Sequence, residues 1–226
     1  MKQAGWRLTA KRMVDWLLSV SALLVLAPLM LVGAMTVLAL MGRPVLYRQW
    51  RPGRNGKPFK LLKFRTMLDT KDNETGPLTD GKRLTRLGRF LRSTSIDELP
   101  QLWNVLRGDL SLVGPRPLRM EYLQRYNMEQ ARRHDVFPGI TGWAQINGRN
   151  ALEWHEKFNY DVWYVDNWSL WLDMRILWGT LLRVTRREGV SHGGQPTMPE
   201  FVGNKAACPK PFSQNAAVDC LPSEKR

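Results

Sequence analysis

Two adjacent carboxylates, Asp97 and Glu98, are the strongest candidates for chemistry in this sequence. In a catalytic interpretation, one carboxylate attacks phosphorus while the other helps to hold Mg²⁺, because a hard cation prefers oxygen ligands. A helix N-terminus at this point would favour the ionised carboxylate and would offer N–H groups to an incoming phosphate. The structural alternative is strong, since Ser95 and Glu98 match the S-x-x-E capping box that begins many helices.

A second candidate is Arg116, in the segment Gly114-Pro-Arg-Pro117. The two prolines are expected to hold the chain extended, so that the guanidinium fork meets phosphate oxygens with little ordering cost. The alternative is a rigid turn that carries a surface arginine.

A third segment, residues 138–150, combines turn residues, an aromatic ring, side-chain amides and an arginine. This mixture predicts part of a nucleotide pocket, in which Gln145 is one of the amides and Arg149 contacts a phosphate. The three histidines are isolated and lack the spacing of metal ligands, so structural or surface roles are expected for His134, His155 and His192.

The elements that must position these residues follow from local patterns. Residues 45–49 and 59–64 predict two strands of a β-hairpin, because turn residues separate them. Residues 69–80 predict a surface loop. Residues 81–92 predict a helix with one apolar and one basic face, and residues 160–187 predict a helix rich in tryptophan. Either helix could lie at a membrane interface or simply face the core.

Residues 16–42 form an apolar run without a charged residue, about twice as long as the apolar part of a signal peptide. Pro28 should break or kink a helix here, leaving arms of about 18 and 22 Å, each shorter than the roughly 30 Å hydrocarbon core. Basic residues flank both ends, and such residues stay on the cytoplasmic side. A re-entrant hairpin is therefore expected, with a kinked spanning helix as the alternative.

The charge balance points to an anionic partner. The chain has 226 residues and a net charge of +14, with 43% hydrophobic and 24% charged residues, which suits one domain plus an appendage. Residues 1–68 contain twelve Lys or Arg and one acid, so the basicity surrounds the apolar run and matches acidic lipid headgroups. The two cysteines, Cys208 and Cys220, lie in a tail-like segment and predict neither a disulfide framework nor a metal site.

Taken together and in order, these motifs resemble the bacterial sugar transferase family, the small monotopic phosphoglycosyl transferases. The resemblance covers roughly residues 8–203 and rests on the central proline, Lys63-Phe-Arg-Thr-Met67, Asp97-Glu-Leu99, Gly114-Pro-Arg-Pro117, Pro138-Gly-Ile-Thr-Gly-Trp-Ala-Gln145 and Asn147-Gly-Arg-Asn150. Residues 150–203 look closest to enzymes that use UDP-N,N'-diacetylbacillosamine. The family's helix usually has Ser-Pro at its break, whereas Ala27 precedes Pro28 here.

The resemblance implies transfer of a sugar 1-phosphate from a UDP-sugar to undecaprenyl phosphate, with release of UMP, at the cytoplasmic face of the bacterial inner membrane. It makes Asp97 the nucleophile that forms a phosphosugar-aspartyl intermediate, and Glu98 a residue that helps to hold Mg²⁺. It makes Arg116 a phosphate ligand, with Lys63, Arg149 and Gln145 as further substrate-binding candidates.

The expected fold is α+β: a re-entrant anchor over residues 1–43, a mainly helical cytoplasmic catalytic domain with a small β-hairpin over residues 44–203, and a mobile tail over residues 204–226. Membrane lipids are expected partners and nucleic acid is not. Two rival functions remain open: a membrane-tethered nucleic-acid binder, motivated by the charge, and a lipid-phosphate hydrolase that uses the same dyad. The sugar, the glycan pathway and the oligomeric state are not fixed by the sequence.

Overall fold

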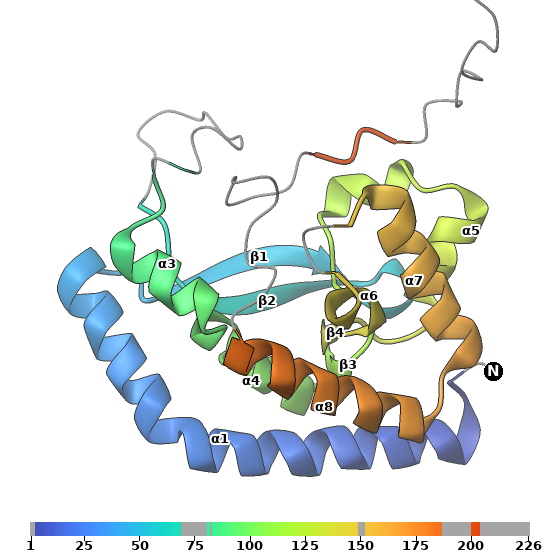
Figure 1. Cartoon of the computed structure of the whole chain (residues 1–226), viewed down its shortest axis with the longest axis horizontal. Coiled ribbons are helices and arrows are strands. Elements are labelled where there is room, and N and C mark those ends of the chain that lie inside the picture. The colour runs from blue at the N-terminus through green and yellow to red at the C-terminus, as the bar shows by residue number, and fades with distance from the viewer. Residues whose placement is uncertain (1–2, 69–80, 82, 149–151, 187–199, 204–226) are drawn as a thin grey trace, which may run out of the picture.

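The computed structural model describes residues 3–68, 81, 83–148, 152–186 and 200–203. A long N-terminal helix packs against a domain of mixed helices and short strands. Helix α1 (Gly5–Met41) has 37 residues, about 56 Å at 1.5 Å per residue, and contains Pro28. Figure 1 shows α1 as a bent helix with two arms (Figure 1). A bend is present in α1, as expected, although the helix is continuous from Gly5 to Met41 (Figure 1).

Helix α1 exposes most of its apolar surface. Among the described residues it is the one helix long and apolar enough to cross a membrane, and 6% of its most apolar stretch is buried. Leu24 and Val25 are 73% and 77% exposed. A helix that leaves such side chains unburied needs an apolar environment other than the protein core.

The expected β-hairpin is confirmed. Strands β1 (Leu46–Pro52) and β2 (Pro58–Phe64) pair antiparallel, with Tyr47 opposite Lys63 and Arg51 opposite Phe59. A short 3-10 turn, η1 (Arg54–Gly56), joins them. A second, parallel pair that the sequence patterns did not indicate consists of β3 (Ser111–Val113) and β4 (Gly139–Thr141).

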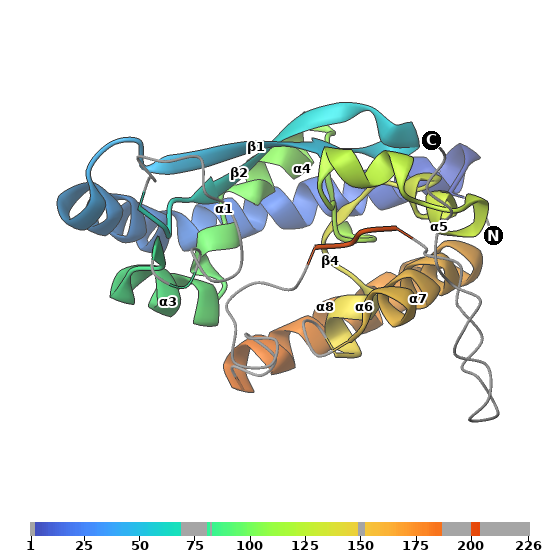
Figure 2. The same cartoon turned by 90° about the horizontal axis from the view of Figure 1, so that it is seen from above.

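The remaining described elements are helical. They are α3 (Arg86–Ser93), η2 (Ile96–Glu98), α4 (Gln101–Arg107), η3 (Met120–Gln124), α5 (Met128–Ala131), η4 (Arg132–His134), α6 (Trp143–Ile146), α7 (Trp154–Asn167) and α8 (Leu170–Arg186). Figure 2 shows the β1–β2 hairpin on one side of the molecule and α6, α7 and α8 on the other (Figure 2).

Two predicted helix boundaries were wrong. The predicted basic helix is interrupted: Gly81 and Arg83 are helical, but Leu84 forms an isolated bridge with Met67, and α3 begins at Arg86. The break lies at Thr85, which is extended and whose hydroxyl caps the backbone N–H of Gly88 at 2.9 Å. The tryptophan-rich segment forms two helices rather than one. Trp168 breaks it, since this residue leaves the helical conformation and buries its ring in the core with 3% exposure. The predicted loop at residues 69–80 and the predicted tail lie outside the described residues.

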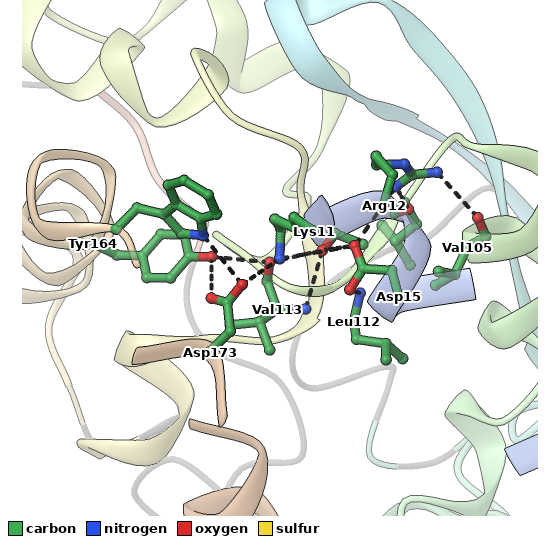
Figure 3. Close-up of polar contacts among 11 residues, drawn as sticks. Lys11, Arg12, Asp15, Val105, Leu112, Val113, Tyr164 and Asp173 are labelled. Atoms are coloured by element: carbon green, nitrogen blue, oxygen red, sulfur yellow. Dashed lines mark hydrogen bonds and ion pairs between the residues drawn. The ribbon is translucent and has the colours of Figure 1, made fainter. Parts of the chain in front are cut away.

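A buried polar network fixes the first turns of α1 to the domain. Lys11 Nζ donates to Asp173 Oδ2 at 2.6 Å, and Tyr164 and Trp168 donate to the same carboxylate at 2.7 and 3.1 Å (Figure 3). Asp15 accepts from the hydroxyl of Ser111 at 2.8 Å. This network connects α1, β3, α7 and α8.

The second arm of α1 also packs on the domain. Val37 is fully buried against Phe64 of β2 and Leu91 of α3. Both arms of α1 therefore contact the same folded unit.

Candidate active site

The carboxylate pair lies on the short turn η2, between α3 and α4. Ser95 precedes the turn in the left-handed conformation, with φ 58° and ψ 15°, and its side chain caps no backbone N–H. The predicted capping box is therefore wrong, because a capping serine needs an extended backbone. Pro100 contributes to the break, since it has no N–H to continue a regular ladder from η2 into α4.

Glu98 is the centre of an ion cluster. Lys63 Nζ of β2 lies 2.7 Å from Glu98 Oε1, and Arg116 Nη2 lies 2.5 Å from the same oxygen. Burial raises the pKa of Glu98, but the positive charges of Arg116 and Lys63 outweigh it and hold the pKa well below its usual value. Glu98, Lys63 and Arg116, which lie far apart in the sequence, thus meet in one ion cluster that favours the ionised form of Glu98.

Asp97 differs sharply from its neighbour. It is 6% exposed, and its carboxylate has no hydrogen-bond or ion-pair partner among the described residues. Burial, followed by the negative charge of Glu98, raises the pKa of Asp97 to about 6. Burial and the charge of Glu98 thus act against the ionised form of Asp97, opposite to the effect expected of a helix start. A carboxylate without a partner keeps its lone pairs available for attack on an electrophile.

Arg116 is held by contacts that the sequence patterns did not reveal. Its backbone carbonyl accepts a hydrogen bond from Arg133 Nη2 at 2.8 Å, and Arg133 forms a buried ion pair with Asp161 at 2.6 Å. The hydroxyl of Tyr126 also accepts from Arg133, at 3.0 Å. Arg133 had no local signal, and the only sign of a functional role for Asp161 was that it lies within residues 150–203, which the family resemblance covers.

Two glycines bring the Arg116 segment against the segment that carries Gln145. A Cβ on Gly114 would lie 2.2 Å from the Phe137 carbonyl oxygen, and one on Gly139 would lie 2.1 Å from the Gly114 nitrogen. Only glycine permits this backbone approach, which allows β3 and β4 to pair. The two predicted motifs therefore converge on one site.

The candidate residues line a cavity of about 1360 Å³, together with Ser95 and residues of β1, α6, α7 and α8. Ten cationic and four acidic side chains line it, so the cavity suits a polyanion. Gln145 lies on this wall, and both polar atoms of its amide are buried without a hydrogen-bond partner among the described residues. Arg149 lies outside the described residues.

The acidic residues are compatible with a magnesium ion that uses few protein ligands. Within the described part of the chain, no group of three or more His, Cys, Asp or Glu side chains could enclose a metal. Mg²⁺ commonly takes one or two carboxylates and completes its shell with substrate phosphates and water. Asp97 and Glu98 supply that number of hard oxygen donors.

Comparison with known proteins identifies the family. A family model described as bacterial sugar transferase matches residues 6–187. The chain belongs to this family. The match includes α1, the dyad, the Arg116 segment and the Gln145 segment, so the family relationship covers the whole site described above.

Individual relatives give the same result. A Bacillus subtilis (strain 168) protein named "Uncharacterized sugar transferase EpsL" is 53% identical over 194 residues, which is 86% of this chain and 96% of the relative. UDP-glucose:undecaprenyl-phosphate glucose-1-phosphate transferase of Klebsiella pneumoniae is 41% identical over 79% of this chain, and the protein of the same name from Escherichia coli (strain K12) is 40% identical over 76%. The chain spans 41% and 39% of those two longer relatives.

Proposed function

We propose that this protein transfers a sugar 1-phosphate from a UDP-sugar to undecaprenyl phosphate and releases UMP. The observation that carries the proposal is the contrast within the dyad: Asp97 is buried without a hydrogen-bond or ion-pair partner in the described part of the chain, whereas adjacent Glu98 is fixed by Lys63 and Arg116. This arrangement lies in a cationic cavity, in a family whose longer relatives are named as transferases of this kind.

The chemistry proceeds in two displacements at one phosphorus. An Asp97 oxygen bonds to the β-phosphorus of the donor while the bond from that phosphorus to the bridging oxygen breaks, and UMP leaves with the electron pair. An oxygen of the lipid phosphate then bonds to the same phosphorus and displaces Asp97. The products are UMP and a polyprenyl diphosphate sugar, and the enzyme is regenerated. Ping-pong kinetics are expected.

The surrounding residues neutralise and orient phosphate. Arg116 and Lys63 present positive charge beside the dyad, and Gln145 offers an amide to which no described residue is hydrogen-bonded. Asp97 and Glu98 would hold Mg²⁺, which when bound supplies positive charge to the diphosphate. Phosphoryl transfer depends mainly on such positioning and charge neutralisation.

The bent helix supports a re-entrant anchor rather than a spanning one. Lys11 in the first arm contacts Asp173, and Val37 in the second arm packs against Phe64. Because both arms contact one polar domain, both ends of α1 belong on the same side of the bilayer. We infer the cytoplasmic side from the basic residues that flank the apolar run. The domain would then meet a soluble donor and a lipid-bound acceptor at the inner-membrane surface.

The identity of the donor sugar is the most specific part of the proposal. The resemblance of residues 150–203 favours an N-acetylated sugar, with UDP-N,N'-diacetylbacillosamine as the first candidate, whereas several relatives are named for glucose or galactose. A panel of these UDP-sugars, scored by UMP release with and without polyprenyl phosphate and Mg²⁺, compares the candidates directly.

The decisive variant is Asp97→Asn, with Asp166→Asn as a matched control because the Asp166 side chain is 48% exposed outside the cavity. We expect Asp97→Asn to abolish UMP release and Asp166→Asn to retain it. Mass spectrometry of enzyme quenched with donor alone should detect a sugar phosphate on the peptide that contains Asp97. Turnover retained by Asp97→Asn, or phosphate released from the lipid without a UDP-sugar, would exclude the mechanism.

A further inference from the structure

A second group of cations lines the same cavity beyond the Glu98 cluster. Residues alternate faces along a strand, so Tyr47, Gln49 and Arg51 share one face of β1, and all three line the cavity. Tyr47 is opposite Lys63 in the hairpin register. Arg51 is four residues further along, about 14 Å at 3.4 Å per residue. Lys63 and Arg51 thus lie at separate positions along the hairpin, and both line the cavity.

Arg51 is a cation without an ion-pair partner among the described residues, although the negative charge of Glu121 acts on it from beyond ion-pair distance. Its Nη2 donates to Gln49 at 2.6 Å, whereas its Nε is buried and has no hydrogen-bond partner among the described residues. No carboxylate of the described residues lies within ion-pair distance of it. Burial, with the nearby positive charges of Arg116 and Arg119, lowers the pKa of Arg51 to about 10. A half-buried cation whose Nε is buried beside like charges would be stabilised by an anion that joins it.

The geometry of in-line displacement indicates which anion this would be, if the proposed function holds. UMP leaves from the face of the phosphorus opposite Asp97. The lipid phosphate must later attack opposite Asp97 as well, because Asp97 is then the leaving group. Both ligands therefore present a phosphate monoester to the same region of the cavity, and Arg51 and Arg119 line the cavity together with Arg116.

We propose that Arg51, together with Arg119, forms an anion subsite for a phosphate monoester: that of the departing UMP, that of the incoming polyprenyl phosphate, or both in turn. The subsite is separate from the Lys63–Glu98–Arg116 cluster. Arg51 and Arg119 supply guanidinium groups, which bind phosphate oxygens through paired N–H donors.

The first test is calorimetric binding of UMP and of neutral uridine to the full-length protein in detergent. Arg51→Gln should weaken UMP binding about tenfold to a hundredfold, the loss expected for charge-assisted hydrogen bonds, and leave uridine binding unchanged. Arg51→Lys keeps the positive charge but lacks the paired N–H donors of the guanidinium. Its affinity for UMP should lie between those of the wild type and Arg51→Gln. Arg107→Gln is the control, because that arginine is 63% exposed outside the cavity. Equal weakening of uridine and UMP would mean structural damage and would overturn the proposal.

The second test separates the two sources of phosphate. In ping-pong kinetics, kcat/KM for each substrate reports its own half-reaction, so the donor and a short-chain polyprenyl phosphate are varied in turn. If Arg51→Gln lowers kcat/KM for the UDP-sugar, Arg51 belongs to a UMP site, and if it lowers kcat/KM for the polyprenyl phosphate, Arg51 belongs to a lipid-phosphate site. A decrease in both values supports use of the subsite by the two phosphates in turn. If Arg51→Gln changes neither kcat/KM value and leaves the affinity for UMP unchanged, the proposed subsite is overturned. If wild-type protein turns over no UDP-sugar, the proposed function fails instead, and the comparison of UMP with uridine still tests Arg51.

Discussion

The ammonium group of Lys11 lies 2.6 Å from Asp173, 162 positions away in the sequence, and their side chains are 2% and 4% exposed. The pair fixes the first turns of α1 against α8. Asp173 also accepts from Tyr164 and Trp168, so its oxygens are fully engaged. The orientation of the anchor relative to the catalytic domain therefore depends on a buried charge pair as well as on apolar packing.

Removal of one member of this pair should be costly. Lys11→Met leaves the Asp173 carboxylate buried without its cation, and we expect it to lower the free energy of unfolding by about 3–5 kcal/mol. Arg107→Gln removes an exposed ion pair to Asp109 and should cost about 0–1 kcal/mol. Denaturant unfolding in detergent, followed by tryptophan fluorescence, measures both. Equal losses for the two variants would mean that the buried pair does not hold α1.

The pH dependence of the first half-reaction should follow Asp97. Its pKa is raised to about 6, and attack requires the ionised form, so single-turnover UMP release should fall as the pH falls through about 6. The charge of Arg92 opposes this rise. Arg92→Gln should therefore raise the pKa of Asp97 and move the acid limb to higher pH. Arg89→Gln, an exposed arginine on the same helix, should leave the limb in place. A shift to lower pH in Arg92→Gln would contradict this electrostatic account.

The parts of the molecule that depend on local pattern could be predicted from the sequence. Turn residues between two apolar runs predicted the β1–β2 hairpin, and Pro28 predicted the bend in α1. Local motifs also named Glu98 and Arg116, and the family resemblance added Lys63, which contacts Glu98 in the fold as Arg116 does.

The parts that depend on long-range contacts could not be predicted. Ser95 had the pattern of a cap but adopts a left-handed conformation, a choice that local propensity does not determine. In the sequence, Arg133 could not be distinguished from a surface arginine. Its role depends on contacts with Asp161 and the Arg116 carbonyl, which only the fold brings together. Arg51 was one of the basic residues after the apolar run, and the buried Nε without a hydrogen-bond partner among the described residues becomes visible once the hairpin places it in the cavity.

The topology of α1 can be tested by labelling. After replacement of Cys208 and Cys220, single cysteines at exposed positions, Ala4→Cys and Lys57→Cys, should react with an impermeant reagent from the same side of sealed vesicles. Pro28→Leu restores the missing backbone N–H and should straighten the helix, which favours a spanning arrangement. In that background the two cysteines should react from opposite sides in a measurable fraction of molecules. Opposite-side labelling without the Pro28 change would mean that α1 spans the membrane.

Helix α8 presents a row of exposed apolar side chains that should enter the membrane surface beside α1. Trp171 and Trp178 are seven residues apart, two helical turns, and are 79% and 64% exposed. Fluorescence quenching by lipids brominated on the acyl chains should fall when both are replaced in Trp171→Ser/Trp178→Ser. Trp50→Ser is the matched control, because Trp50 is 54% exposed on the hairpin, on the opposite side from α8 (Figure 2). If Trp50→Ser lowers quenching as much as the double variant does, α8 is not the face that contacts lipid.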